Sequence, residues 1–131
     1  MSDRAGQILI AEDDPINADL LQDLLESQGW TVEQAEDGGV ALDKMRSTYY
    51  DLLLLDLHMP NVDGVEVLRT LRLDEITRPG RVVVVTADLL YGIREDLASL
   101  GADVLLSKPV DITALLDLAR ESMPAEAGKA G

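Results

Sequence analysis

Hydrophobic residues along the chain alternate between short continuous runs and longer stretches with helical spacing. Continuous apolar runs occupy residues 8–11, 52–55 and 82–85, and each ends at a polar residue. Such runs are typical of strands that are buried on both faces of a parallel sheet. Two weaker strands are predicted at residues 31–35 and 103–106.

Between these strands, apolar residues recur every three or four positions, as in amphipathic helices. Asp14 and Asp111 are predicted N-caps, and Gly29 and Gly101 are predicted helix ends. Five strands that alternate with five helices predict an α/β fold, a doubly wound parallel sheet with right-handed crossovers. The apolar helix positions are Ile16, Leu20, Leu21, Leu24 and Leu25; Ala41, Leu42 and Met45; Val65, Leu68 and Leu71; Leu90, Ile93, Leu97 and Leu100; and Ile112, Leu115, Leu116 and Ala119.

Composition restricts the class of protein. The 131 residues predict one domain, over residues 1–123, followed by a short disordered tail at 124–131. A net charge of −14 argues against binding of nucleic acid or of anionic membranes through general electrostatics. The absence of cysteine excludes disulfides, zinc–thiolate sites and thiol nucleophiles. With neither a signal peptide nor a membrane-length apolar run, the sequence predicts a cytoplasmic domain.

Polar residues with complementary chemistry follow four of the predicted strands. Glu12 and Asp13 follow the first strand, Asp56 the third, Thr86 the fourth and Lys108 the fifth. In a parallel sheet these positions meet at one edge, where ligands bind in doubly wound folds. Clustered carboxylates repel one another, and an all-oxygen donor set favours Mg²⁺. A hydroxyl and an ammonium suit phosphoryl oxygens, and an aspartate so placed is a candidate nucleophile toward phosphorus.

Each of these residues taken alone has an ordinary structural explanation. An aspartate after a strand is more often a turn or cap residue, which is the interpretation that we keep for Asp14 and Asp111. Lys108-Pro109 alone is a turn signal, and Thr86 alone is a strand-end residue. Their joint occurrence, each at the end of its own strand, favours a phosphoryl-transfer site.

Four sequence motifs carry a family resemblance. ILIAEDD, LLLLDLHMPNVDG, VVVVTA and LLSKP resemble the motifs of response-regulator receiver domains (CheY-like), the phosphoacceptor modules of two-component signalling. The resemblance spans residues 7–123, and the spacing of the motif from Asp56 to Gly64 is highly specific. It implies a flavodoxin-like five-stranded parallel sheet of order 2-1-3-4-5 with five helices.

The resemblance also implies the metal site and the phosphoacceptor. Asp56 is similar to the aspartate that the family phosphorylates. Asp13 matches a direct Mg²⁺ ligand, and Glu12 matches an acidic partner that acts through water. His58 occupies the position whose backbone carbonyl coordinates the metal, so its side chain is expected to line the rim of the site.

The remaining motif residues imply a switch with one departure. Thr86 matches the hydroxyl that moves toward the phosphoryl group, and Lys108 matches the lysine that pairs with the acyl phosphate. Pro109 resembles a proline that follows a cis peptide bond. Leu105 stands where the family usually carries Tyr or Phe, so the usual coupling of hydroxyl and aromatic ring is not expected. Activation is instead expected to stay near the loops after the third and fourth strands.

The function implied is that of a stand-alone receiver and not of an enzyme in the ordinary sense. It accepts a phosphoryl group from a histidine kinase or phosphotransfer protein onto Asp56 with Mg²⁺, hydrolyses it slowly, and signals by protein contact or onward relay. A receiver excised from a hybrid kinase is an alternative, which the initiator Met disfavours.

Two other classes of function remain as alternatives. A dehalogenase-like phosphatase also uses an aspartyl nucleophile, but it needs an acid two residues later, where this chain has His58, and a cap over the substrate. A flavin-binding module shares the fold, but it needs a phosphate-binding loop after the first strand. There Glu12, Asp13 and Asp14 would repel phosphate in the absence of metal.

Overall fold

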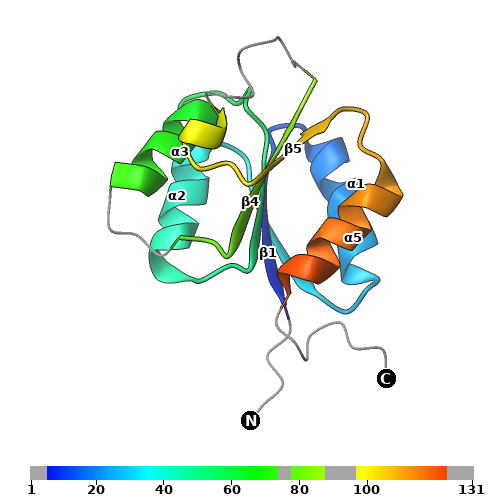
Figure 1. The fold of residues 1–131 in the computed structure, drawn as a ribbon. Coiled ribbons are helices and arrows are strands. Elements are labelled where there is room, and N and C mark those ends of the chain that lie inside the picture. The colour runs from blue at the N-terminus through cyan, green and yellow to red at the C-terminus, as the bar shows by residue number, and fades with distance from the viewer. Residues whose placement is uncertain (1–5, 74–77, 88–96, 124–131) are drawn as a thin grey trace.

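A five-stranded parallel sheet forms the centre of the computed structural model, which describes residues 6–73, 78–87 and 97–123 (Figure 1). The strand order is β2-β1-β3-β4-β5, so the predicted α/β class and strand order are confirmed. The strands are β1 (Gln7–Ala11), β2 (Thr31–Ala35), β3 (Leu52–Leu55), β4 (Arg81–Thr86) and β5 (Val104–Ser107).

Helices cover both faces of this sheet. In Figure 1, α2 and α3 lie on one side of the sheet, and α1 and α5 lie on the other. The bounds are α1 (Pro15–Glu26), α2 (Gly38–Ser47), α3 (Gly64–Leu73) and α5 (Ile112–Ser122). Residues 97–99 are also helical, and the rest of the predicted fourth helix, with Leu90 and Ile93, lies outside the described residues.

Alternate residues of the central strands supply two hydrophobic cores. Leu9 and Leu53 point into the core under α2 and α3, whereas Ile8 and Leu52 point into the core under α1 and α5. Because both faces are buried, these strands need continuous apolar runs, which is the pattern that the sequence shows. Trp30 is also buried in the second core.

The predicted helix caps are present. The Asp14 carboxylate accepts a hydrogen bond from the Ile16 N–H at 3.0 Å, and Asp111 accepts one from the Ala114 N–H at 3.1 Å. Gly29 lies three residues after the end of α1, and Gly101 lies two residues after the helical residues 97–99. Both adopt a positive φ, a backbone conformation that glycine adopts without steric cost. The predicted tail at 124–131 lies outside the described residues.

Tyr50 ties β2 and β3 together at the amino-terminal end of the sheet. Its side chain is buried, and its hydroxyl donates to Glu33 Oε1 at 3.0 Å. Lys44 Nζ donates to the same oxygen at 3.2 Å. Burial, followed by the hydrogen bond to the Glu33 carboxylate, raises the pKa of Tyr50 to about 12.

This raised pKa predicts a loss of stability in alkali that Tyr50→Phe should reduce. The unfolded chain releases the phenol proton near pH 10, whereas the folded chain holds it to about pH 12. The stabilisation is therefore complete below pH 10 and disappears as the pH rises to 12. Chemical denaturation at pH 9 and 11.5 should show that Tyr50→Phe loses on the order of 2 kcal/mol less than the wild type. Tyr49→Phe is the matched control, and an equal pH response of all three proteins would contradict the assignment.

Candidate phosphoryl-transfer and metal site

Strand register places the predicted site residues at one edge of the sheet. Ala11 is paired with Leu55, so Glu12 and Asp56 are the next residues on adjacent strands. The Asp56 N–H donates to the Ala11 carbonyl at 3.0 Å. Thr86 is paired with Ser107, and the Lys108 N–H donates to the Thr86 carbonyl at 3.0 Å. The strand ends therefore converge as the sequence predicts.

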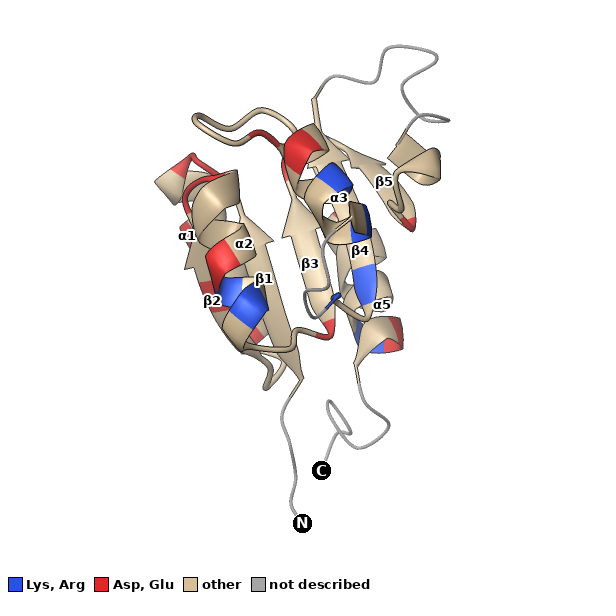
Figure 2. Ribbon diagram, turned by 90° about the vertical axis from the view of Figure 1, so that its left-hand side faces the viewer, with Lys and Arg blue, Asp and Glu red and all other residues tan. Residues whose placement is uncertain are grey.

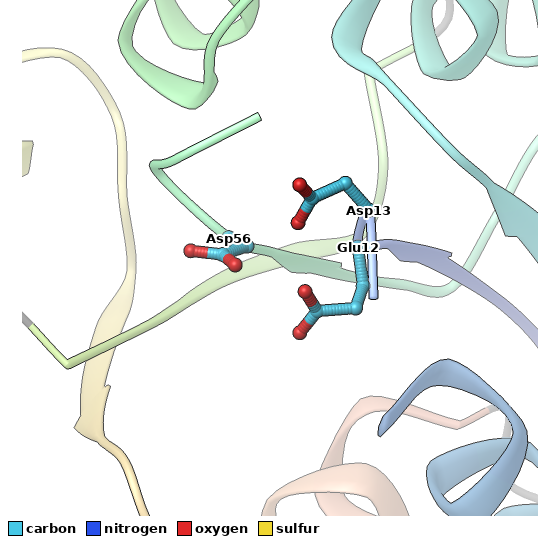
Figure 3. Close-up of side chains that lie close together, drawn as sticks. All are labelled: Glu12, Asp13 and Asp56. Carbon is cyan, nitrogen blue, oxygen red and sulfur yellow. The ribbon is translucent and has the colours of Figure 1, made fainter. Parts of the chain in front are cut away.

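Three carboxylates form a cluster at this edge. One oxygen from each of Glu12, Asp13 and Asp56 lies within 4.8 Å of the others. Figure 3 shows the three side chains directed into one space from the ends of β1 and β3. Glu12 and Asp56 are buried, whereas Asp13 is exposed, so the cluster opens to solvent on one side. In Figure 2, further acidic positions lie at this end of the sheet.

Lys108 bridges two of these carboxylates. Its Nζ donates to Glu12 Oε1 at 2.9 Å and to Asp56 Oδ2 at 3.1 Å. The sequence predicted Lys108 beside Asp56 but gave no indication of the ion pair with Glu12. One ammonium among three carboxylates leaves an excess of negative charge at the edge of the sheet.

The site perturbs the ionisation of Glu12 and Lys108. Burial raises the pKa of Glu12, and the charge of Asp56 adds to this, against the opposing hydrogen bonds from Lys108 and the Asp14 N–H. Burial by itself lowers the pKa of Lys108, but its hydrogen bonds to Glu12 and Asp56 outweigh burial and raise that pKa overall. Lys108 is therefore an ammonium at neutral pH.

Thr86 and His58 lie where the motifs place them. Thr86 is fully buried at the end of β4, between the strands that carry Asp56 and Lys108. The His58 N–H donates to Asp56 Oδ1 at 3.1 Å, and the imidazole is exposed, as expected for a residue at the rim. The Lys108–Pro109 peptide bond is cis, as the resemblance implies.

The donor set at this edge fits Mg²⁺. It contains carboxylate oxygens and neither a thiolate nor an imidazole among the clustered groups. Mg²⁺ binds through one or two carboxylates and keeps several waters, so a cluster open to solvent on one side suits it. The excess negative charge described above would be relieved by a divalent cation.

Sequence reasoning missed the end of the second strand. Glu36-Asp37-Gly38 follows β2 as the other motifs follow their strands. Its position directly after a strand could have marked it as part of the same edge of the sheet. Asp37 caps α2 and also accepts a hydrogen bond from the side chain of Asn61, in the loop after Asp56. A single carboxylate in a turn gave no indication of that distant partner.

Comparison with known proteins decides the family. The family profile described as "Response regulator receiver domain" matches residues 8–120. The chain belongs to the response-regulator receiver family. This receiver domain is a two-component phosphoacceptor and not a conventional enzyme, which rules against the phosphatase and flavin-binding alternatives. The family also implies a histidine kinase as a partner.

Relatives support the same assignment. The polar-differentiation response regulator DivK of Brucella ovis is 34% identical over 110 residues, which cover 84% of this chain and 89% of DivK. A CheY-like receiver domain protein from Methanospirillum hungatei is 31% identical with a TM-score of 0.82, over 90% of this chain and 93% of the other. These likenesses agree with the CheY-like flavodoxin fold that the strand order indicates.

One similar structure bears on the metal. The receiver domain of a Pseudomonas aeruginosa sensor histidine kinase, solved with magnesium coordinated in its active-site cleft, is 30% identical to this receiver domain. The TM-score is 0.80 over 90% of this chain and 97% of the other. The Glu12, Asp13 and Asp56 cluster of this receiver domain is consistent with such a magnesium site.

The departure at the usual aromatic position is visible in the structure. Leu105 lies in β5, is half-buried, and packs against the core under α2 and α3. That Leu105 does not change position on activation stays a prediction. The segment in which we expect the activation change, near Asp88, Leu89 and Leu90, lies outside the described residues.

Proposed function

We propose that Asp56 is the phosphoacceptor of this receiver domain and that Thr86 and Lys108 stabilise the phosphoryl group. The observation that carries the proposal is the position of Lys108 Nζ, between Glu12 Oε1 at 2.9 Å and Asp56 Oδ2 at 3.1 Å. This ammonium lies directly beside the carboxylate that would become the acyl phosphate. Charge-assisted contacts of this kind stabilise developing charge on phosphoryl oxygens.

The chemistry is an in-line displacement at phosphorus. A carboxylate oxygen of Asp56 forms a bond to the phosphorus of a phosphohistidine, the P–N bond breaks, and the imidazole leaves with the electron pair of that bond. Glu12, Asp13, Asp56 and the His58 carbonyl would hold Mg²⁺, which when bound supplies positive charge beside the phosphoryl oxygens. The Lys108 ammonium can keep its ion pair with Glu12 while it contacts a phosphoryl oxygen of the acyl phosphate on Asp56.

The surroundings of Asp56 prepare its carboxylate for the transfer. Burial of Asp56 limits water at the nucleophile, and the hydrogen bond from the His58 N–H to Oδ1 fixes the orientation of the carboxylate. Thr86, buried at the neighbouring strand end, offers a hydroxyl to a phosphoryl oxygen once that group is attached. The hydrogen bond from the His58 N–H and the ion pair with Lys108 are already assembled in the fold, which lowers the reorganisation that the transfer requires.

Partners and place of action follow from the same chemistry. The donor is a histidine kinase or a histidine phosphotransfer protein, and output is a contact with another protein or onward transfer to a second histidine. The acidic surface disfavours nucleic acid and anionic membranes as partners, and the place of action is the cytoplasm. No helix among the described residues combines the length and apolar character needed to cross a bilayer. The receiver domain is assigned to residues 1–123.

Acetyl phosphate with Mg²⁺ tests the proposal without the unknown kinase. We expect one phosphoryl adduct in the intact mass of the protein, formed with Mg²⁺ and absent with EDTA. Borohydride reduction of the acyl phosphate, followed by peptide mass analysis, should place the modification on Asp56. A stable adduct on Thr86 or another hydroxyl, or labelling independent of Mg²⁺, would show that the assigned chemistry is wrong.

A further inference from the structure

The β3–α3 loop (residues 57–63) joins the proposed phosphoacceptor to α3 and carries the His58 carbonyl. It is closed at its base by Gly64, whose N–H donates to the Leu57 carbonyl at 3.0 Å. A Cβ at Gly64 would lie 2.5 Å from the Asp56 carbonyl oxygen, so only glycine allows this approach. The base of the loop is therefore fixed next to Asp56.

The tip of the loop is held by a different element, the turn into α2. The Gly38 N–H donates to the Val62 carbonyl at 2.9 Å, and Asn61 Nδ2 donates to Asp37 Oδ2 at 3.1 Å. Gly38 is buried, and a Cβ there would collide with the Val62 carbonyl oxygen and with the Val67 side chain. This close contact exists only because residue 38 is glycine.

The conformations of Asn61 and Asp37 suit the hydrogen bond between them. Asn61 has φ 65°, a left-handed conformation that asparagine tolerates better than most residues. The two carboxylate oxygens of Asp37 accept different hydrogen bonds, Oδ1 from the Val40 N–H at 2.9 Å and Oδ2 from Asn61. The Val40 hydrogen bond, followed by that of Asn61, lowers the pKa of Asp37, so the carboxylate is charged at neutral pH.

We propose that Asp37 and Gly38 are positioning residues for the phosphoacceptor site, acting through the β3–α3 loop. They touch neither the carboxylate cluster nor the proposed position of the metal. They hold Asn61 and Val62, and the loop so held fixes the His58 carbonyl, which would ligate Mg²⁺, and the His58 N–H, which orients Asp56. Residues that orient the ligands of a metal without binding it commonly tune the affinity of the site for that metal, and this is the role that we assign to Asp37 and Gly38. The proposal rests on the assignment of the Mg²⁺ site above.

A pair swap between Asp37 and Asn61 separates this role from general stability. Asn61→Asp keeps a residue that tolerates the left-handed backbone but places two carboxylates face to face. The double variant Asp37→Asn with Asn61→Asp restores one donor and one acceptor and has the net charge of the wild type. Asn61→Gly keeps the backbone conformation and removes only the side-chain amide.

Titration calorimetry with MgCl₂ is the main measurement. We expect Asn61→Gly and Asn61→Asp to bind Mg²⁺ about threefold to tenfold more weakly than the wild type and the swapped variant to recover most of that loss. The extra negative charge of Asn61→Asp would by itself strengthen Mg²⁺ binding, so a weaker affinity reports geometry. Amide hydrogen exchange of residues 57–63 should become faster in the two single variants and return toward wild type in the swap.

Several controls make the outcomes distinct. Asp43→Asn removes an exposed carboxylate of α2 that is paired with Arg46 of the same helix, so the Mg²⁺ affinity of this variant should match the wild type. Gly38→Ala should weaken Mg²⁺ binding in the same direction as the Asn61 variants. Unchanged affinity in both Asn61 single variants, or a swap that fails to recover affinity, would overturn the positioning role. A wild type that binds no Mg²⁺ and accepts no phosphoryl group would instead remove the proposed function on which that role rests.

Discussion

Asp56→Asn is expected to abolish phosphoryl transfer and to leave the fold at least as stable as the wild type. The amide has no anionic oxygen with which to attack phosphorus, so acetyl phosphate and Mg²⁺ should give no adduct at this position. Its Oδ1 can still accept the hydrogen bond that the His58 N–H donates, so the β3–α3 loop keeps its contact. Intact-mass analysis after incubation with acetyl phosphate measures the loss.

The same substitution reduces the repulsion at the end of the sheet. It removes one of the three carboxylates that lie within 4.8 Å of one another, and Lys108 keeps its ion pair with Glu12. In EDTA we expect the melting temperature to rise by about 3 °C, which corresponds to about 1 kcal/mol for a domain of this size. The opposite change, a clear loss of stability, would show that the ion pair of Lys108 with Asp56 outweighs the repulsion. An adduct that persists in Asp56→Asn would move the phosphoacceptor to another residue.

Asp13→Ala is expected to abolish stabilisation by Mg²⁺. A ligand that binds only the folded state stabilises it by mass action, so Mg²⁺ at tenfold its dissociation constant should contribute about 1.4 kcal/mol to the wild type. Asp13 is the exposed member of the cluster, directed into the same space as Glu12 and Asp56. Without it, thermal unfolding with and without Mg²⁺ should give the same melting temperature.

Asp14→Ala is the matched control for that experiment. Asp14 is the adjacent acidic residue, and its Oδ1 accepts from the Ile16 N–H at 3.0 Å as the N-cap of α1. Losing the cap should destabilise the fold by about 1 kcal/mol, but the rise in melting temperature with Mg²⁺ should be retained. Equal loss of the Mg²⁺ response in both variants would show that the division into ligand and cap is mistaken.

The sequence by itself determined the order of the elements and the chemistry at the strand ends. Continuous apolar runs such as Leu52 to Leu55 predict buried parallel strands because both faces of those strands must be covered. Once the strands are parallel, Asp13, Asp56, Thr86 and Lys108 must meet at one edge, whatever the details of packing. The family motifs carry the same information, because their spacing records which residue follows which strand.

Only the tertiary structure decided which of these groups pair and how the loop after Asp56 is held. The contact of Lys108 with Glu12 joins residues 96 positions apart, and that of Asn61 with Asp37 joins residues 24 positions apart. Hydrophobic periodicity reports burial along one element, and it contains no information on which side chain from a distant loop will lie within hydrogen-bonding distance. In the sequence, Gly38 likewise looks like an ordinary residue at a helix start. Glycine is needed there because the Val62 carbonyl approaches so closely, and this approach exists only when β2, α2 and the β3–α3 loop are packed together.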